Sequence, residues 1–263
     1  MGLVALSAAA LACNQEDAQP PAEADESAAH PEHVEAETSS EVPELTTYGE
    51  LRRINIEGDM SASIGLTDAL SGSSRLNHAV GALGELSGEI TVWDDKVYLA
   101  DAGEPPVFSV LSPNEVDEAK DATLLFGAAV SDWEPVPIEG GGDLDALERA
   151  LDAWRSQKRV DEALAFRITD PAATADWHVI DAKRLPDGVS SCDERMEYAH
   201  AFESRNEPLR IVGLHTDNHT GVVVDHSTSL HAHVITDDDR TGHLDDLTLS
   251  TSARLEVAVR DPM

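Results

Sequence analysis

Three histidines late in the chain have the residue type and spacing of metal ligands. The residues from 229 to 236 alternate in polarity, so His231 and His233 should point to one face of a strand. The acidic turn at 237–242 can reverse the chain and set His243 opposite this pair. Three imidazole nitrogens suit a divalent metal and leave a fourth position for a reactant, as in many catalytic sites. The sequence therefore predicts an open metal site, against the simpler interpretation of three surface histidines beside an acidic turn.

Other histidines could extend or replace this set. His215, His219 and His226 lie just upstream, and His178 could be a neighbour in the sheet. Taken singly, each is more often a surface or hydrogen-bonded histidine than a ligand. Known H-x-H patterns fit poorly, because a metallo-hydrolase needs aspartate where Ile235 stands and a cupin needs a second motif that the sequence lacks.

The elements expected around these histidines are mostly strands. Alternating residues on either side of Asp94-Asp95 predict a hairpin of residues 90–92 and 97–99. An amphipathic helix should begin at Asp143, because Leu144, Leu147, Leu151 and Trp154 share one face. Another helix is expected over 61–70, and further strands over 123–130, 165–169, 177–182, 209–214 and 221–224. The fold class is therefore α+β, a single domain of mainly antiparallel or mixed β-sheet with a few helices.

The beginning of the chain differs in composition from this domain. Residues 1–13 form a short apolar run ending at Cys13, which resembles a bacterial lipoprotein signal, although no Lys or Arg precedes Arg52. Residues 14–46 are rich in Ala, Glu, Asp and Pro and predict a disordered acidic linker that includes His30 and His33. We expect an exported, periplasmic or cell-surface protein anchored by lipid at Cys13, with the folded domain over 47–263. Cys192 is then the remaining thiol, and no disulfide forms within the chain.

Charge restricts the partners. The chain has 18 basic and 51 acidic residues, for a formal net charge of -33. Such a surface repels nucleic acid and anionic lipid headgroups. We therefore expect no nucleic-acid partner, and contact with a membrane through the lipid anchor alone.

Several segments together resemble one enzyme family. In order they are Leu86-Ser-Gly-Glu-Ile-Thr-Val-Trp, Ala165-Phe-Arg-Ile, Trp177-His-Val-Ile-Asp-Ala-Lys-Arg-Leu-Pro, and His231-Ala-His with Gly-His243-Leu-Asp-Asp. This order is similar to that of the α-acetolactate decarboxylases and spans most of residues 47–250. The resemblance implies that His231, His233 and His243 hold zinc and that Glu89 lies beside the metal as the acid or base. It also implies a small anionic keto acid as substrate, 2-acetolactate or a similar 2-hydroxy-3-keto acid, and acetoin as product.

The sequence also departs from this family. Where the family has an active-site arginine, Lys183 or Arg184 stands here, and the two cations are not equivalent in binding a carboxylate. The chain ends at Met263, before the tail that carries another glutamate in the family, and Glu256 lies too close to the hairpin for that role. These departures favour the alternative of a non-catalytic lipoprotein that binds a metal or small ligand. The sequence is compatible with a homodimer.

Overall fold

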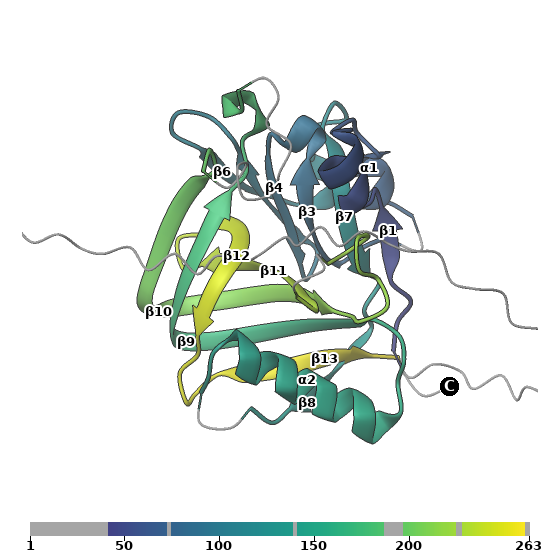
Figure 1. Cartoon of the computed structure of the whole chain (residues 1–263), viewed down its shortest axis with the longest axis vertical. Helices are drawn as coiled ribbons and strands as arrows, with labels where there is room; N and C mark the ends of the chain where they lie inside the picture. The colour runs from purple at the N-terminus through teal and green to yellow at the C-terminus, as the bar shows by residue number, and fades with distance from the viewer. Residues whose placement is uncertain (1–41, 73–74, 139–140, 187–196, 225–227, 261–263) are drawn as a thin grey trace, which may run out of the picture.

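The computed structural model describes residues 42–72, 75–138, 141–186, 197–224 and 228–260. Within these residues the chain folds into two β-sheets that pack against each other, with one long helix on the outside (Figure 1). The expected α+β fold class, mainly antiparallel sheet with few helices, is confirmed. No helix in this part of the chain is both long and apolar enough to cross a bilayer.

The first sheet is antiparallel and has the order β1-β7-β3-β4-β5-β6, with β2 beside β7. Its strands are β1 (Thr46–Tyr48), β2 (Ile64–Gly65), β3 (His78–Leu83), β4 (Gly88–Trp93), β5 (Lys96–Asp101), β6 (Val107–Leu111) and β7 (Asp121–Ala128). The predicted hairpin is β4 and β5, and its turn residues Asp94 and Asp95 both have positive φ angles of 45° and 65°. Two such residues form the turn whose twist matches the flanking strands.

The second sheet contains two long strands of 16 residues each. Its strands are β8 (Asp132–Val136), β9 (Leu164–Val179), β10 (His200–His215), β11 (Leu230–Thr236), β12 (Thr241–Thr248) and β13 (Arg254–Val259). β10 pairs with both β9 and β11, and β12 pairs with both β11 and β9, so these four strands form a closed ring of pairings. β13 joins the other end of β9 and carries β8 at the edge.

The helical elements cover the outer faces. α1 (Leu66–Ala69) packs on the first sheet and α2 (Leu144–Lys158) on the second (Figure 1). As predicted, Asp143 caps α2 by accepting a hydrogen bond of 2.9 Å from the Ala146 N–H, and Leu147, Leu151 and Trp154 are buried. Short helical turns complete the elements: η1 (Arg53–Glu57), η2 (Gly84–Leu86), η3 (Pro113–Glu115) and η4 (Ala182–Arg184).

Three local predictions need correction. The helix expected over 61–70 is only α1, because Ser63 and Gly65 pair with β7 first. The strands expected at 165–169 and 177–182 are one strand, β9, which ends at Val179. Residues 221–224 form a turn closed by a bridge between Thr220 and Val224, and Val223 and Val224 are buried without forming a strand.

The folded part also begins before residue 47. Val42 is buried among the apolar side chains of the second sheet, and Thr46 already pairs with Gly127 in the first. Residues 42–46 therefore belong to the fold and not to the expected linker. Cys13, His30, His33, Cys192 and His226 lie outside the described residues.

Candidate metal centre

The predicted hairpin brings the three histidines together. β11 and β12 are antiparallel, and His233 pairs directly with His243. His231 and His233 face the first sheet, whereas Ala232 and Val234 face the core under α2. The ring centroids are 5.6 Å apart for His231 and His233, 5.1 Å for His231 and His243, and 5.7 Å for His233 and His243. Rings that bind one zinc ion through nitrogens at about 2.0–2.1 Å have centroids about 5 Å apart.

A backbone carbonyl fixes the tautomer of His231. Its Nδ1 lies 2.7 Å from the Val223 carbonyl oxygen. Because a carbonyl only accepts, Nδ1 must carry the proton, and the lone pair of the neutral ring is on Nε2. Second-shell contacts of this kind orient metal-binding histidines.

A chain of hydroxyl groups fixes the tautomer of His233 in the same way. The Thr241 hydroxyl donates to the Val234 carbonyl at 2.8 Å, so it must accept from the Thr91 hydroxyl, 2.6 Å away. Thr91 has then used its proton, and the His233 Nδ1–H must donate to it at 2.9 Å. The lone pair of His233 is therefore also on Nε2.

The nitrogens left over are buried without hydrogen-bond partners. His233 Nε2 and His243 Nδ1 are both in this state. Burial lowers the pKa of His231 to about 3 and that of His233 well below its ordinary value, with the neighbouring histidines adding to the effect. Neutral imidazoles with unused lone pairs fit a divalent metal, whereas an empty cluster would leave buried polar atoms unsatisfied.

Glu89 enters the cluster from the other sheet. It lies on β4, is 3% exposed, and its Oε1 accepts a hydrogen bond of 3.0 Å from the Ile180 N–H. Its Oε2 is 3.7 Å from His233 Nε2. Burial raises the pKa of Glu89 to about 8, so the carboxyl holds a proton at neutral pH when no metal is nearby. The centre therefore lies between the two sheets, with an acid beside the histidines.

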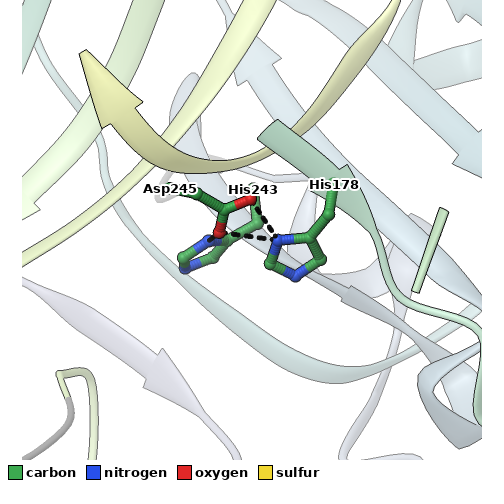
Figure 2. A group of neighbouring side chains, drawn as sticks. All are labelled: His178, His243 and Asp245. Carbon is green, nitrogen blue, oxygen red and sulfur yellow. Dashed lines mark hydrogen bonds and ion pairs between the residues drawn. The ribbon is translucent and has the colours of Figure 1, made fainter. Parts of the chain in front are cut away.

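Two more residues extend the cluster on its open side. His178 on β9 pairs with His243 on β12, and its Nδ1 is 2.8 Å from Asp245 Oδ1 (Figure 2). Although burial alone would raise the pKa of Asp245, its contacts with His178 and His243 lower it well below the usual range. The ligand atoms of His178, His243 and Asp245 all lie within 4.8 Å of one another. His243 therefore belongs both to the predicted trio of histidines and to this more closely spaced group.

We favour the set with His231 and His233 as the primary one. Hydrogen bonds at Nδ1 leave Nε2 of both rings as the lone-pair nitrogen, and that of His233 is buried without a hydrogen-bond partner, whereas Asp245 already accepts from His178. His243 and Asp245 have side-chain exposures of 35% and 34%, against 1% for His233, so a small molecule would reach the centre from their side.

Lys183 and Arg184 lie on the turn η4, after the end of β9. Both are exposed, and neither contacts the three histidines or Glu89. Arg184 instead donates 3.0 Å to the Tyr198 carbonyl and lies 3.4 Å from Glu104. The family-based assignment of a substrate-binding cation to Lys183 or Arg184 stays a prediction.

The sequence prediction missed part of this centre. Thr91 and Asp245 were not considered, and His178 was weighed only as a neighbour in the sheet. Strand alternation could have indicated the first two, since Thr91 follows Glu89 by two residues and Asp245 follows His243 by two. Of the alternates, His219 bonds to Thr216, and His215 faces α2 on the opposite side of the sheet.

Comparisons with known proteins show which solved structures have a similar fold. No protein-family model matches the sequence, and no curated protein matches it. Among solved structures, the chain is similar to acetolactate decarboxylase from Bacillus subtilis subspecies spizizenii, with a TM-score of 0.64 and 14% identity over 83% of this chain and 87% of that one. The enzyme from Bacillus subtilis strain 168 gives 0.62 and 14% over 84% and 86%. A Staphylococcus aureus protein of unknown function, described as similar to α-acetolactate decarboxylase, gives 0.63 and 16% over 82% and 86%. The chain therefore has the fold of the acetolactate decarboxylases.

Proposed function

We propose that this protein is a zinc-dependent decarboxylase of 2-acetolactate, or of a similar 2-hydroxy-3-keto acid, with acetoin as the product. The observation that carries the proposal is the meeting of three histidines, two of them kept neutral by burial, with a buried carboxyl. It is supported by the shared fold.

His231, His233 and His243 would hold the zinc ion. When bound, the ion would supply a Lewis acid for the keto and hydroxyl oxygens of the substrate. In the tautomers described above, His231 and His233 already present Nε2 without any change of protonation. His243 is the partly exposed ligand, and its side chain would rotate toward the ion as the ion binds.

Glu89 would manage the proton of the reaction. Loss of CO₂ leaves an electron pair on carbon, and that carbon must then gain a proton. The Glu89 Oε2 atom faces the histidines, while the Ile180 N–H holds Oε1 in place. Burial raises the pKa of Glu89 to about 8 in the metal-free centre, and a zinc ion beside it would lower this pKa, so the carboxyl could take up and return a proton near neutral pH.

A metal-binding protein without catalysis is the second candidate. A decarboxylase must orient the substrate carboxylate, but Lys183 and Arg184 are exposed, and Arg184 donates to the Tyr198 carbonyl instead. In addition, the acidic Asp245 lies at the open side, where it would repel an anion. These two observations favour a ligand that is not an anion, or the bare metal ion.

Zinc content and acetoin formation separate the two candidates. The full chain, its His243→Ala variant and a matched His200→Ala control would be dialysed against zinc and analysed by mass spectrometry. We expect His243→Ala to lose one equivalent of zinc that His200→Ala keeps.

Acetoin formation is measured with racemic 2-acetolactate. Wild type should form acetoin, and Glu89→Gln should form it about 100-fold or more slowly, whereas the exposed control Glu85→Gln should keep the wild-type rate. Zinc at these histidines without acetoin supports the binding protein, and equal zinc in both histidine variants would overturn both candidates.

We also propose that the chain is exported and lipid-anchored. The apolar run that ends at Cys13 supports this. Wild type should partition with membranes and Cys13→Ala with the soluble fraction. A wild type found entirely in the soluble cytoplasmic fraction would contradict export and anchoring.

A further inference from the structure

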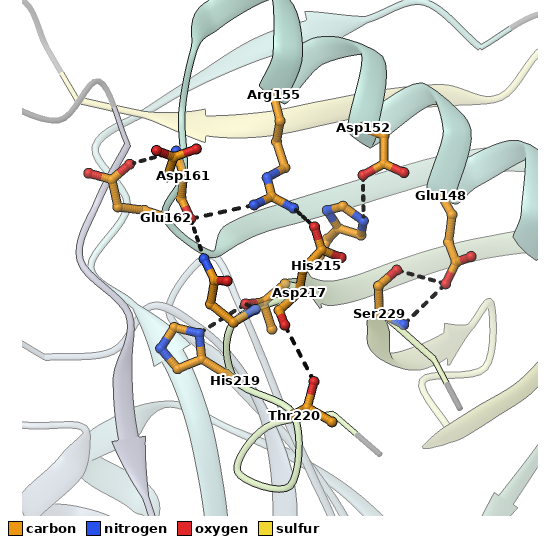
Figure 3. Close-up of polar contacts among 12 residues, drawn as sticks. Glu148, Asp152, Arg155, Asp161, Glu162, His215, Asp217, His219, Thr220 and Ser229 are labelled. Atoms are coloured by element: carbon orange, nitrogen blue, oxygen red, sulfur yellow. Dashed lines mark hydrogen bonds and ion pairs between the residues drawn. The ribbon is translucent and has the colours of Figure 1, made fainter. Parts of the chain in front are cut away.

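A second cluster of metal-ligating side chains lies under α2, on the opposite face of the second sheet from the centre described above (Figure 3). Its central residue is His215, at the end of β10. The His215 side chain is 0% exposed, and neither of its ring nitrogens makes a hydrogen bond. A buried donor or acceptor without a partner is destabilising, so a ring with two such nitrogens favours a bound partner.

Two carboxylates face this ring from different elements. Asp152 comes from α2, and Asp217 comes from the segment that follows β10. One ligand atom from each of the three residues lies within 4.8 Å of the other two. His215 Nε2 is 3.4 Å from Asp152 Oδ1, which is longer than a good N–H···O hydrogen bond. It is close to the separation of about 3.3 Å between two ligands of one zinc ion.

The local charge also favours a cation. Glu148, Asp152 and Asp217 all act electrostatically on His215, and Arg155 is the cation among them. Arg155 Nη1 is 2.6 Å from Asp217 Oδ2, which leaves the other oxygen of Asp217 unused by this pair. Three carboxylates and one arginine leave an excess of two negative charges around His215. A divalent ion would balance this excess. Burial lowers the pKa of His215, so the ring stays neutral and keeps a lone pair.

We propose that Asp152, His215 and Asp217 bind a zinc ion that links α2 to the end of β10. One nitrogen and two carboxylate oxygens suit zinc, with solvent available for the fourth position because both aspartates are largely exposed. The ion would also steady the segment after Asp217, whose Val223 carbonyl orients His231. This proposal does not rest on the proposed decarboxylase activity.

The test uses the full chain with His233→Ala and His243→Ala, so that the first metal centre is removed. In this background Asp152→Asn is compared with Asp145→Asn, which removes one carboxylate from the same helix outside the cluster. Zinc affinity is measured by competition titration with a chromogenic chelator, and the melting temperature is measured with and without zinc. We expect one equivalent of zinc in the background and in Asp145→Asn, and binding weaker by more than about tenfold in Asp152→Asn. Zinc should raise the melting temperature in the first two proteins only.

His215→Gln gives the second arm. If this variant folds, as judged by circular dichroism, it should lose the zinc equivalent. If it does not fold, the surface variant Asp217→Asn takes its place, with the same expected loss. Equal zinc binding in Asp145→Asn and in both cluster variants, or no zinc bound by the background protein, overturns the proposal. An unbound His215 that only forms an ion pair with Asp152 would give this last result.

Discussion

At the scale of single residues, the candidate centre depends on hydroxyl groups as much as on histidines. Thr91 is fully buried and accepts the Nδ1–H of His233 while donating to Thr241. Without it, His233 could carry its proton on Nε2, where it would block a metal. Thr91 therefore acts on the metal through His233, as a positioning residue.

Replacing Thr91 with valine should weaken zinc binding at the three histidines. Removal of such an outer partner lowers metal affinity by about 10–100-fold. The measurement is a competition titration against a chelator. Thr123→Val is the matched control, because Thr123 is also buried but bonds to the Met60 carbonyl, away from the centre. Equal affinities in the two variants would show that Thr91 does not set the tautomer.

His78 joins the two sheets and should make stability depend on pH. Its Nε2–H donates 2.9 Å to the Phe166 carbonyl on β9, and burial lowers its pKa to about 4. The unfolded chain binds a proton near its ordinary pKa of 6.5, so the folded chain binds fewer protons between these values. The stabilisation is therefore complete above pH 6.5 and is lost as the pH falls toward 4.

The difference between wild type and His78→Gln isolates this effect from other titrating groups. From about pH 7.5 to about pH 5, the free energy of unfolding of wild type should fall by about 2 kcal/mol more than that of the variant. Urea titrations at a series of pH values measure it. Parallel pH profiles would mean that His78 binds its proton in the folded protein as readily as in the unfolded chain.

At the scale of elements, the hairpin of β11 and β12 must sit closely on β9. Gly242 makes this approach, since a Cβ atom there would lie 2.4 Å from the His178 carbonyl oxygen and 2.5 Å from the Trp177 ring. A backbone carbonyl in a paired strand cannot move aside without moving the strand. The glycine next to His243 therefore fixes how far β12 stands from β9.

Substituting alanine at Gly242 should disturb both stability and the metal centre. Overpacking of this kind costs about 1–3 kcal/mol in the free energy of unfolding. Zinc affinity at the three histidines should fall as well, because His243 moves with β12. Gly103→Ala is the control, with only the Pro105 carbonyl at 3.4 Å from the added atom. A variant as stable and as tightly zinc-binding as this control would contradict the close-approach explanation.

The elements differ in how far the sequence predicts them. The β4–β5 hairpin and α2 were predicted because alternation, turn residues and a capping aspartate agree locally. The sequence predicts two strands, over 165–169 and 177–182, where the structure has the single strand β9, with Pro171 in the stretch between them. In the structure Pro171 is exposed, beside a bulge between Glu207 and Leu209, so its missing N–H costs no hydrogen bond and the strand continues.

In the candidate site, too, residues close in the sequence are easier to predict than residues that come from distant strands. His231, His233 and His243 could be placed together from one hairpin. Glu89 and His178 come from strands far away in the sequence, and no local pattern says which strands will face each other. Glu89 is expected at the centre only from the family resemblance, and His178 is expected only as a neighbour in the sheet.

At the scale of the whole molecule, charge repulsion should dominate over ion pairs. If every one of the 18 basic residues paired with one carboxylate, 33 carboxylates would remain without a cation. Pairs such as Arg205 with Asp176 and Arg240 with Asp238 are at the surface, where each contributes about 0–1 kcal/mol. Salt weakens these pairs, but it also screens a much larger number of repulsions.

Added salt should therefore stabilise the folded protein. Raising NaCl from about 0.01 M to about 1 M shortens the screening length from about 30 Å to about 3 Å. We expect the free energy of unfolding in urea, an uncharged denaturant, to rise by at least about 1 kcal/mol, because the compact chain concentrates its negative charge more than the unfolded one. KCl at equal concentration should act equally if screening is the cause. A free energy that stays level or falls with salt would mean that the ion pairs, and not the excess carboxylates, decide the electrostatic part of stability.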